Sequence, residues 1–313
     1  MQNAHTNKHS DDYNEIDLRE LFYVLSEGRW IIVSVTTFIS IIGVIYSLLL
    51  PNIYESKALL VPVNLSSGIS GALGGYSGIA GLAGIDLPSD GDDGNAAQAI
   101  QKITSLSFFE NNILTNIYLP DLMAVKSWNP KTNTVAFDEN IYNTNSNTWI
   151  RNYSYPQKQI PSAQESFQEF TSKHLSLSED AKSGFITLSI KHHSPFIAKQ
   201  WVELTVNEVN SYYRQKDKIE SESSVRYLEQ QISITVLSEI KQVLASLLQE
   251  EAKKLTLIEA NQYYVFDYID PPAVMEEKSE PKRALICILS ALLGAILSIL
   301  LVFIRQSSFM KKD

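Results

Sequence analysis

Histidines are the side chains of this chain best suited to bind a metal ion or to exchange protons near neutral pH. His192 and His193 are adjacent in a segment with the alternation of a β-strand, so their side chains should point to opposite faces. Two ligands on opposite faces cannot bind one metal ion. His174 has no such neighbour in the sequence, and His5 and His9 lie in a polar tail. We therefore predict no metal site.

Carboxylates and nucleophiles give no better case for catalysis. The acidic pairs Glu250–Glu251 and Glu276–Glu277 could supply a general acid and a general base, but both lie in strongly polar stretches typical of solvated surface. Neither G-x-S-x-G nor H-E-x-x-H, the spacings of two common hydrolase classes, occurs in the sequence. We expect a protein that is not an enzyme and that binds no cofactor.

Most of the 13 glycines fall between Gly68 and Gly94. A phosphate-binding loop would need G-x-G-x-x-G or Gly-Lys-Ser/Thr, and neither occurs in this stretch. We interpret it as a loop with small apolar side chains, with contact to the membrane surface or to a neighbouring subunit as the alternative. The net charge of −9, without a prominent basic patch, argues against a nucleic-acid partner.

Two uncharged apolar runs set the organisation of the chain. Trp30–Leu50 and Ala284–Ile304 each match the ~20 residues that cross the hydrocarbon core of a bilayer. The first follows an acidic tail and ends at Pro51, unlike a cleaved signal peptide. The single cysteine, Cys287, lies in the second run and excludes an intramolecular disulfide.

These runs predict a two-pass membrane protein. Basic residues flank both sides almost equally, but long domains translocate largely regardless of charge. We therefore expect the central domain in the periplasm and both tails in the cytoplasm. The predicted segments are the amino-terminal tail 1–29, the spans 30–50 and 284–304, the periplasmic domain 51–283 and the carboxy-terminal tail 305–313.

Small residues recur every four positions in both runs. The second run carries Ser290, Gly294 and Ser298, and the first carries Gly43 and Ser47. Small side chains at this interval let helix backbones approach closely in lipid, although glycine and serine are also simply tolerated in spans. We predict that these five residues pack the two spans together.

The sequence of the central domain predicts an α+β fold. Apolar, partly alternating segments near 54–63, 185–192 and 264–270 indicate strands of a mixed base, and an amphipathic helix is expected over 95–118. No glycine or proline occurs from Phe196 to Asp270, which favours very long helices. The β-branched run 232–236 is the weakest helical stretch, so we place the reversal of an antiparallel helical arm, residues 195–262, near it. One apolar face per helix predicts a homo-oligomer.

The stretch IDPPAVMEEKSEPKRALICIL, residues 269–289, joins this domain to the second run. Pro271, Pro272 and Pro281 restrict the backbone to extended conformations, which would fix the angle at which the chain enters the span. Lys282 and Arg283 can meet lipid phosphates. We predict that these five residues form a functional motif.

Three segments resemble the Wzz chain-length determinants, the polysaccharide co-polymerases of Gram-negative bacteria. They are IDLRELFYVLSEGRW before the first run, YESKALLVP after it and DPPAVMEEKSEPKRALI before the second. Met275 stands where a further proline of the last motif would be expected. The motif therefore has one proline fewer here than in typical members.

The resemblance implies a periplasmic base near the inner membrane with a long helical arm, assembled into a ring. Such proteins set the modal length of polysaccharide that a Wzy-type polymerase makes on undecaprenyl-linked repeat units, and they are not known as enzymes. Related co-polymerases often carry a cytoplasmic tyrosine kinase; the tail 305–313 has no room for one, which points to O-antigen or a similar glycan. A membrane-anchored periplasmic sensor or adaptor and an exopolysaccharide export scaffold are the alternatives.

Overall fold

The computed structural model describes residues 26–63 and 93–310 of the chain. The tail with His5 and His9, and the glycine-rich stretch apart from its last two residues, lie outside these ranges. The chain divides into two compact units. One is Asn52–Ser279; the other combines the segments Met1–Pro51 and Glu280–Asp313.

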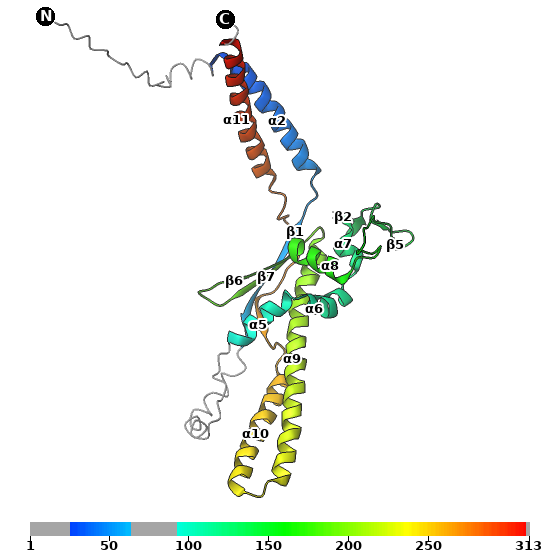
Figure 1. The fold of residues 1–313 in the computed structure, drawn as a ribbon, viewed down its shortest axis with the longest axis vertical. Coiled ribbons are helices and arrows are strands. Elements are labelled where there is room, and N and C mark those ends of the chain that lie inside the picture. The colour runs from blue at the N-terminus through cyan, green and yellow to red at the C-terminus, as the bar shows by residue number, and fades with distance from the viewer. Residues whose placement is uncertain (1–25, 64–92, 311–313) are drawn as a thin grey trace, which may run out of the picture. The chain divides into compact units, whose positions relative to one another are not determined.

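The second of these units contains a pair of apolar helices, α2 (Arg29–Leu49) and α11 (Arg283–Met310) (Figure 1). Both are long and apolar enough to cross a membrane, with mean hydropathies of 2.3 and 2.9. They pack against each other along much of their length. α2 begins one residue before the predicted run, whereas α11 continues past Ile304.

The Asn52–Ser279 unit is built on a four-stranded antiparallel sheet in the order β6-β7-β1-β8. The strands are β1 (Tyr54–Pro62), β6 (Leu175–Glu179), β7 (Ile186–His192) and β8 (Phe266–Asp270). Tyr54 at the start of β1 is opposite His192, and Pro62 at its end is opposite Phe266. The strand next to the first apolar helix in sequence therefore lies inside the sheet.

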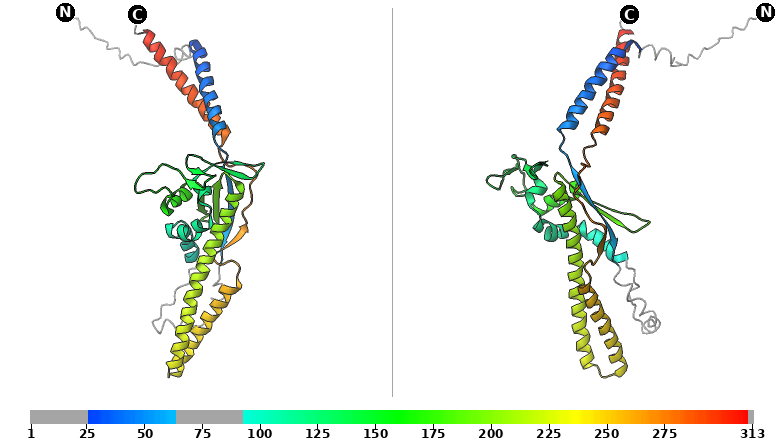
Figure 2. Two further views of the ribbon diagram at one scale, coloured as in Figure 1. Left: turned by 90° about the vertical axis from the view of Figure 1, so that its right-hand side faces the viewer. Right: turned by 180° about the vertical axis from the view of Figure 1, so that it is seen from behind.

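Two long helices form the arm (Figures 1 and 2). α9 (Pro195–Ile234) has 40 residues and α10 (Ser238–Ala260) has 23, and the chain reverses over Thr235–Leu237. The first part of α9 packs on the sheet, where its buried side chains join the core of the base. Beyond that core the two helices pack mainly on each other. The fold is thus the predicted mixture of helix and sheet with a long antiparallel helical arm.

The predicted helix over 95–118 is interrupted. The structure has α5 (Asp93–Ile103), the short α6 (Leu106–Phe108), a π-helical turn over Phe109–Ile113 and a 3₁₀ turn over Leu114–Asn116. Ser105 has extended backbone, and its Oγ accepts a hydrogen bond from the Phe108 backbone N–H. Side-chain capping of this kind competes with a continuous helix, and it lets Phe108 and Phe109 both enter the core.

The connection over residues 120–161 also contains regular structure. α7 (Leu119–Met123) leads into two small hairpins, β2–β3 (Val125–Asn129, Thr134–Phe137) and β4–β5 (Tyr142–Asn143, Thr148–Trp149). Tyr142 and Trp149 are buried in a small, separate hydrophobic cluster. Such short strands carry too few residues for the alternation to be recognised in sequence.

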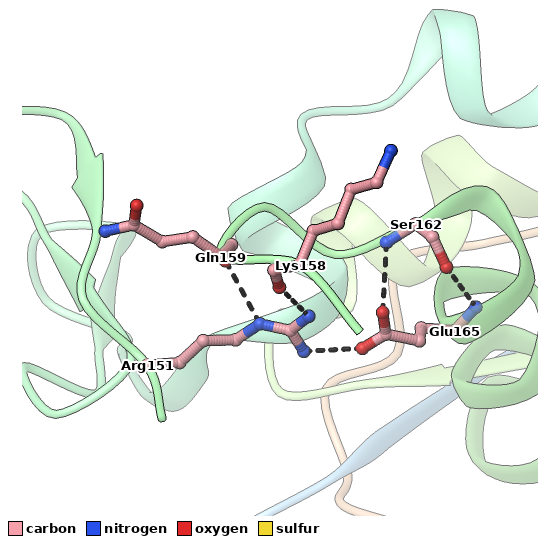
Figure 3. A network of polar contacts seen from close by, with 5 residues as sticks. All are labelled: Arg151, Lys158, Gln159, Ser162 and Glu165. Atoms are coloured by element: carbon pink, nitrogen blue, oxygen red, sulfur yellow. Dashed lines mark hydrogen bonds and ion pairs between the residues drawn. The ribbon is translucent and has the colours of Figure 1, made fainter. Parts of the chain in front are cut away.

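Arg151 fastens the loop after β5 to α8 (Ala163–Glu169) (Figure 3). Its Nη1 lies 2.6 Å from Glu165 Oε2, and its Nε and Nη2 donate to the carbonyls of Gln159 and Lys158. Ser162 and Glu165 form a reciprocal capping box at the start of α8. The hydrogen bond from Arg151 is the main cause that lowers the pKa of Glu165. The loop is therefore fixed by a guanidinium at its centre.

Candidate functional site

The proline segment after β8 runs back along the first half of β1. Ser56 Oγ donates to the Ala273 carbonyl (2.8 Å), and the Ser279 N–H donates to the Ile53 carbonyl (2.9 Å). Pro272 is buried while Pro271 is exposed. Because prolines cannot donate hydrogen bonds, the serines on either side supply the contacts that hold this segment against β1.

The other half of the predicted motif belongs to the unit of apolar helices. The Lys282 carbonyl accepts hydrogen bonds from the N–H groups of Leu285 (3.0 Å) and Ile286 (3.2 Å), so it starts α11. The Arg283 N–H donates to the Pro281 carbonyl (2.9 Å). Pro271 and Pro272 therefore end a strand, whereas Pro281, Lys282 and Arg283 begin a helix; the predicted motif is divided between two units.

The small residues predicted to pack the spans lie at the contact of α2 with α11. A Cβ added to Gly43 would lie 2.2 Å from Ser290 Oγ, and one added to Gly294 would lie 3.1 Å from the Thr36 Cα. Ser47 and Ser298 are both buried. Any larger side chain at Gly43 would force the helices apart, so the backbones approach as closely as glycine allows.

Two further residues belong to this contact and were not predicted. Thr36 Oγ1 lies 3.4 Å from Ser298 Oγ, and Gly28 lies against Val302, where an added Cβ would come within 2.6 Å. Thr36 continues the spacing of Ser40, Gly43 and Ser47 along one stripe of α2, a signal that was present in the sequence. Gly28 precedes the apolar run and gave no such signal.

The root of the arm is held by polar side chains of α9. Asn210 is buried; its Nδ2 donates to the Phe266 carbonyl (2.9 Å), and its Oδ1 accepts from the N–H groups of Val265 (2.8 Å) and Phe266 (2.9 Å). Arg214 Nη2 donates to the carbonyls of Asn261 and Gln262. These contacts close the turn between α10 and β8. They fix where the arm leaves the sheet.

Tyr264 adds a further tie at the same turn. Its hydroxyl donates to Asp217 Oδ2 at 2.6 Å. Burial first, and then this hydrogen bond, raise the pKa of Tyr264, so the phenol stays neutral and remains a donor. Sequence reasoning missed Asn210 and Arg214, because polar residues inside a long helix give no signal of a distant backbone partner. It missed Tyr264 because its partner, Asp217, is 47 residues away.

The histidines form a group around Trp201. His174 is not isolated as the sequence suggested: its ring centroid lies 5.8 Å from that of His192, and both rings contact Trp201. The Ser194 N–H donates to His192 Nδ1 (2.9 Å), so the proton of the neutral ring is on Nε2, which faces the Asp121 carbonyl (2.9 Å). His174 Nδ1 donates to the Lys191 carbonyl. Both ring nitrogens of His192 are thus used within the protein.

Burial controls the charge of these groups. It is the main cause that lowers the pKa of His192 to about 3, and it also lowers the pKa of His174 and of His193. Burial raises the pKa of the Asp121 carboxyl to about 6. The group is therefore neutral at pH 7 apart from Asp121, and it serves to pack α9 on β7.

Two family models match parts of the chain. Residues 14–113 match the model of the Wzz family, described as chain length determinant protein. Residues 230–307 match a model described as a G-rich domain on putative tyrosine kinase. No curated protein matches the chain.

Several solved structures are similar. A full-length bacterial polysaccharide co-polymerase is 13% identical, with a TM-score of 0.40 over 93% of this chain and 98% of that one. A fragment of WzzB from Salmonella Typhimurium is 12% identical, with a TM-score of 0.33 over 73% of this chain and all of that one. A point mutant of the Shigella flexneri O-antigen chain-length regulator WzzBSF is 12% identical, with a TM-score of 0.26 over 72% and 100%.

The family match itself covers α2, β1, α5, α6 and the π-helical turn Phe109–Ile113. It includes two of the three segments on which the sequence resemblance depends, those before and after the first apolar run. The third, at residues 270–286, lies in the match over residues 230–307. Residues 14–113 thus match the Wzz chain length determinant family, and the resemblance to that family is confirmed.

Proposed function

We propose that this protein sets the modal length of a surface polysaccharide, O-antigen, as an inner-membrane co-polymerase. It acts with a Wzy-type polymerase that extends chains on undecaprenyl-linked repeat units. The observation that carries the proposal is the match of residues 14–113 to the chain length determinant family. O-antigen is the choice of glycan because the resemblance to the Wzz chain-length determinants points to O-antigen or a similar surface glycan.

The arrangement of the chain supports a periplasmic regulator held by two spans. The Asn52–Ser279 unit is connected at both ends to helices that are apolar enough to cross a membrane. Tails 1–29 and 305–313 then lie in the cytoplasm. Lys282 and Arg283, at the start of α11, contact lipid phosphates.

Exposed apolar residues support assembly into a homo-oligomer. On α10, Ile240 is 49% exposed, Val243 55% and Leu247 39%, and together they form one stripe of the helix. The neighbouring side of the helix, with Leu244 and Leu248, is more buried. A second copy of the arm covers the exposed stripe, because contiguous apolar surface is costly in water.

The function is tested on a gel of lipopolysaccharide from a strain in which the gene is deleted. Deletion should turn a ladder clustered around one length into a ladder that decays smoothly with length, and the gene should restore the cluster. Loss of the cluster in the double variant Pro271→Ala, Pro281→Ala is expected, because both prolines fix the path between β8 and α11. Tyr155→Ala, at a side chain 98% exposed, is the control and should restore the cluster.

An unchanged ladder in the deletion strain would contradict the choice of O-antigen. The same comparison on capsule and on common antigen then tests length regulation itself. No change in any of the three glycans would overturn the proposed function.

A further inference from the structure

One end of the Asn52–Ser279 unit carries an aromatic cluster that the proposed function does not use. Tyr54, the first residue of β1, meets Trp128 of β2 edge to face with 5.4 Å between ring centroids. Trp128 also meets Phe196, in the first turn of α9, at 6.2 Å. Lys126 and Lys131 flank Trp128 on the β2–β3 hairpin. We name these five residues the Trp128 surface.

The Trp128 surface is open rather than enclosed. Phe196 is 46% exposed, and both lysines are exposed. Within the described part of the chain the hairpin pairs only with itself, as a two-stranded sheet, and such a hairpin is marginally stable alone in water. Residues 125–137 contain two lysines and no carboxylate; Asp138 and Glu139 follow. The surface therefore combines aromatic rings with local positive charge.

Chain connectivity holds this surface near the bilayer. Asn52 lies three residues after the end of α2, which is at most ~11 Å of chain, and Ser279 lies four residues before α11, at most ~14 Å. Both residues belong to the same end of the unit, because Ser279 donates to Ile53, and Lys278 Nζ lies 3.4 Å from Asn52 Oδ1. Figures 1 and 2 show β2 beside the start of β1, at the end of this unit opposite the tip of the arm.

We propose that the Trp128 surface docks on the headgroup layer of the bilayer that α2 and α11 cross. The headgroup layer is roughly 5–8 Å thick on each side of the hydrocarbon core, so the tether brings the surface within its reach. Tryptophan and tyrosine prefer this layer because it accepts an apolar ring and its polar edge together. Lys126 and Lys131 reach the lipid phosphates while their stems cover the rings. This contact gives the domain a third attachment to the membrane beside the two spans.

The test uses the full-length protein with Cys287→Ser, in nanodiscs of phosphatidylethanolamine and phosphatidylglycerol. A spin label is attached at Thr132→Cys, on the exposed turn of the hairpin, or at Val236→Cys, at the arm tip, where the native side chain is 95% exposed. Its collisions with oxygen and with a water-soluble nickel complex are measured. At Thr132 the ratio of oxygen to nickel collisions should rise above that at Val236, because oxygen concentrates in the bilayer and the nickel complex is excluded.

The charge-reversal variant Lys126→Glu, Lys131→Glu separates docking from folding, because both side chains are exposed and their loss leaves the core unchanged. It should return the ratio at Thr132 to the value at Val236. Equal ratios at the two labels in the native background would overturn the proposal. Loss of both kinds of collision at Thr132 would also overturn it, because that result shows cover by protein rather than by lipid.

Discussion

The two helix pairs of this protein solve the packing problem in opposite ways. α2 and α11 meet through Gly43, Gly294 and Ser298, the smallest side chains they carry, and turn their large apolar residues outward. α9 and α10 meet through larger side chains, with Leu228 and Ile258 buried. Lipid offers apolar side chains the same surroundings as a partner helix, so only close backbone approach favours association there. In water, burial of large side chains provides the stability.

The outward apolar residues of α2 and α11 therefore differ from those of α10 in what covers them. Lipid covers those of α2 and α11 without further protein. On α10 the same exposure, as at Val243, leaves an apolar stripe that needs a partner. The difference supports assembly through the arm.

The largest expected effect tests the packing of α10 into the core at the base of the arm. Ile258→Ala removes a side chain that is 1% exposed and should lower the free energy of unfolding by about 2–5 kcal/mol. Chemical denaturation of the full-length protein in detergent, followed by tryptophan fluorescence, measures it. The matched variant Leu247→Ala, on the exposed stripe, should change it by less than ~0.5 kcal/mol in a monomer. An equal loss for Leu247→Ala would show that the outer stripe is buried in the assembled protein.

The next effect tests close approach of the apolar helices. Gly43→Leu places a side chain where Ser290 already lies, and overpacking of this kind costs about 1–3 kcal/mol. Disulfide formation between Thr36→Cys and Ser298→Cys, in a Cys287→Ser background in membranes, should be high and should fall with Gly43→Leu. Val44→Leu, facing outward one residue further on, is the control and should leave the cross-link unchanged. A cross-link that forms equally well with Gly43→Leu would contradict the conclusion that a larger side chain at this position separates the helices.

A smaller effect concerns the pH dependence of the packing between α9 and the base. His192 has a folded pKa of about 3 against an unfolded value of ~6.5, so the unfolded state binds more protons between these values and stability falls as pH decreases. From pH 7 to pH 5 this group alone costs about 2 kcal/mol. Asp121, whose folded pKa of about 6 lies above its unfolded value, acts in the opposite direction over about pH 4–6 and offsets part of that loss.

Asp121→Asn should therefore steepen the loss of stability between pH 7 and pH 5. Denaturation followed by tryptophan fluorescence reports it, because Trp201 contacts His192. A pH dependence unaffected by Asp121→Asn would mean that other groups control the root of α9.

The smallest effect concerns the ion pair of Lys218 and Glu259, which joins α9 to α10 on the surface of the arm. Exposed pairs contribute little and are screened by salt. Lys218→Met should slightly increase amide hydrogen exchange in α10 at low ionic strength, and the difference should disappear at ~1 M salt. A difference that persists in high salt would show a packing role for the lysine stem.

Sequence periodicity predicted the features that recur over many residues. The two apolar runs, three of the four sheet strands and the long arm, with its reversal beside the β-branched run at 232–236, follow from hydropathy and from the absence of glycine and proline. β6 was missed because LSLSE alternates leucine with serine and contains little apolar surface. The break at Ser105 depends on one side-chain hydrogen bond, which competes closely with helix continuation.

The contacts of the candidate site were less predictable. The small-residue spacing indicated one stripe of each apolar helix, because repeated geometry leaves a repeated pattern. Asn210 and Trp128 gave no comparable signal. Their partners are backbone groups and rings more than fifty residues away, brought together only by the completed fold.

The antiparallel path of residues 266–279 along 53–62 has a mechanical consequence. The two paired segments connect to the apolar helices at the same end. A force that separates the helices therefore acts on one pair of contacts at a time, as in a zipper, rather than on all of them at once, as in shear. The bond between Ser279 and Ile53 would open first, then the bond between Ser56 and Ala273, and only then the pairing of Asp270 with Leu59. Tension between the spans would thus peel the proline segment from β1 stepwise while leaving the root of the arm, held by Asn210, as the last point to yield.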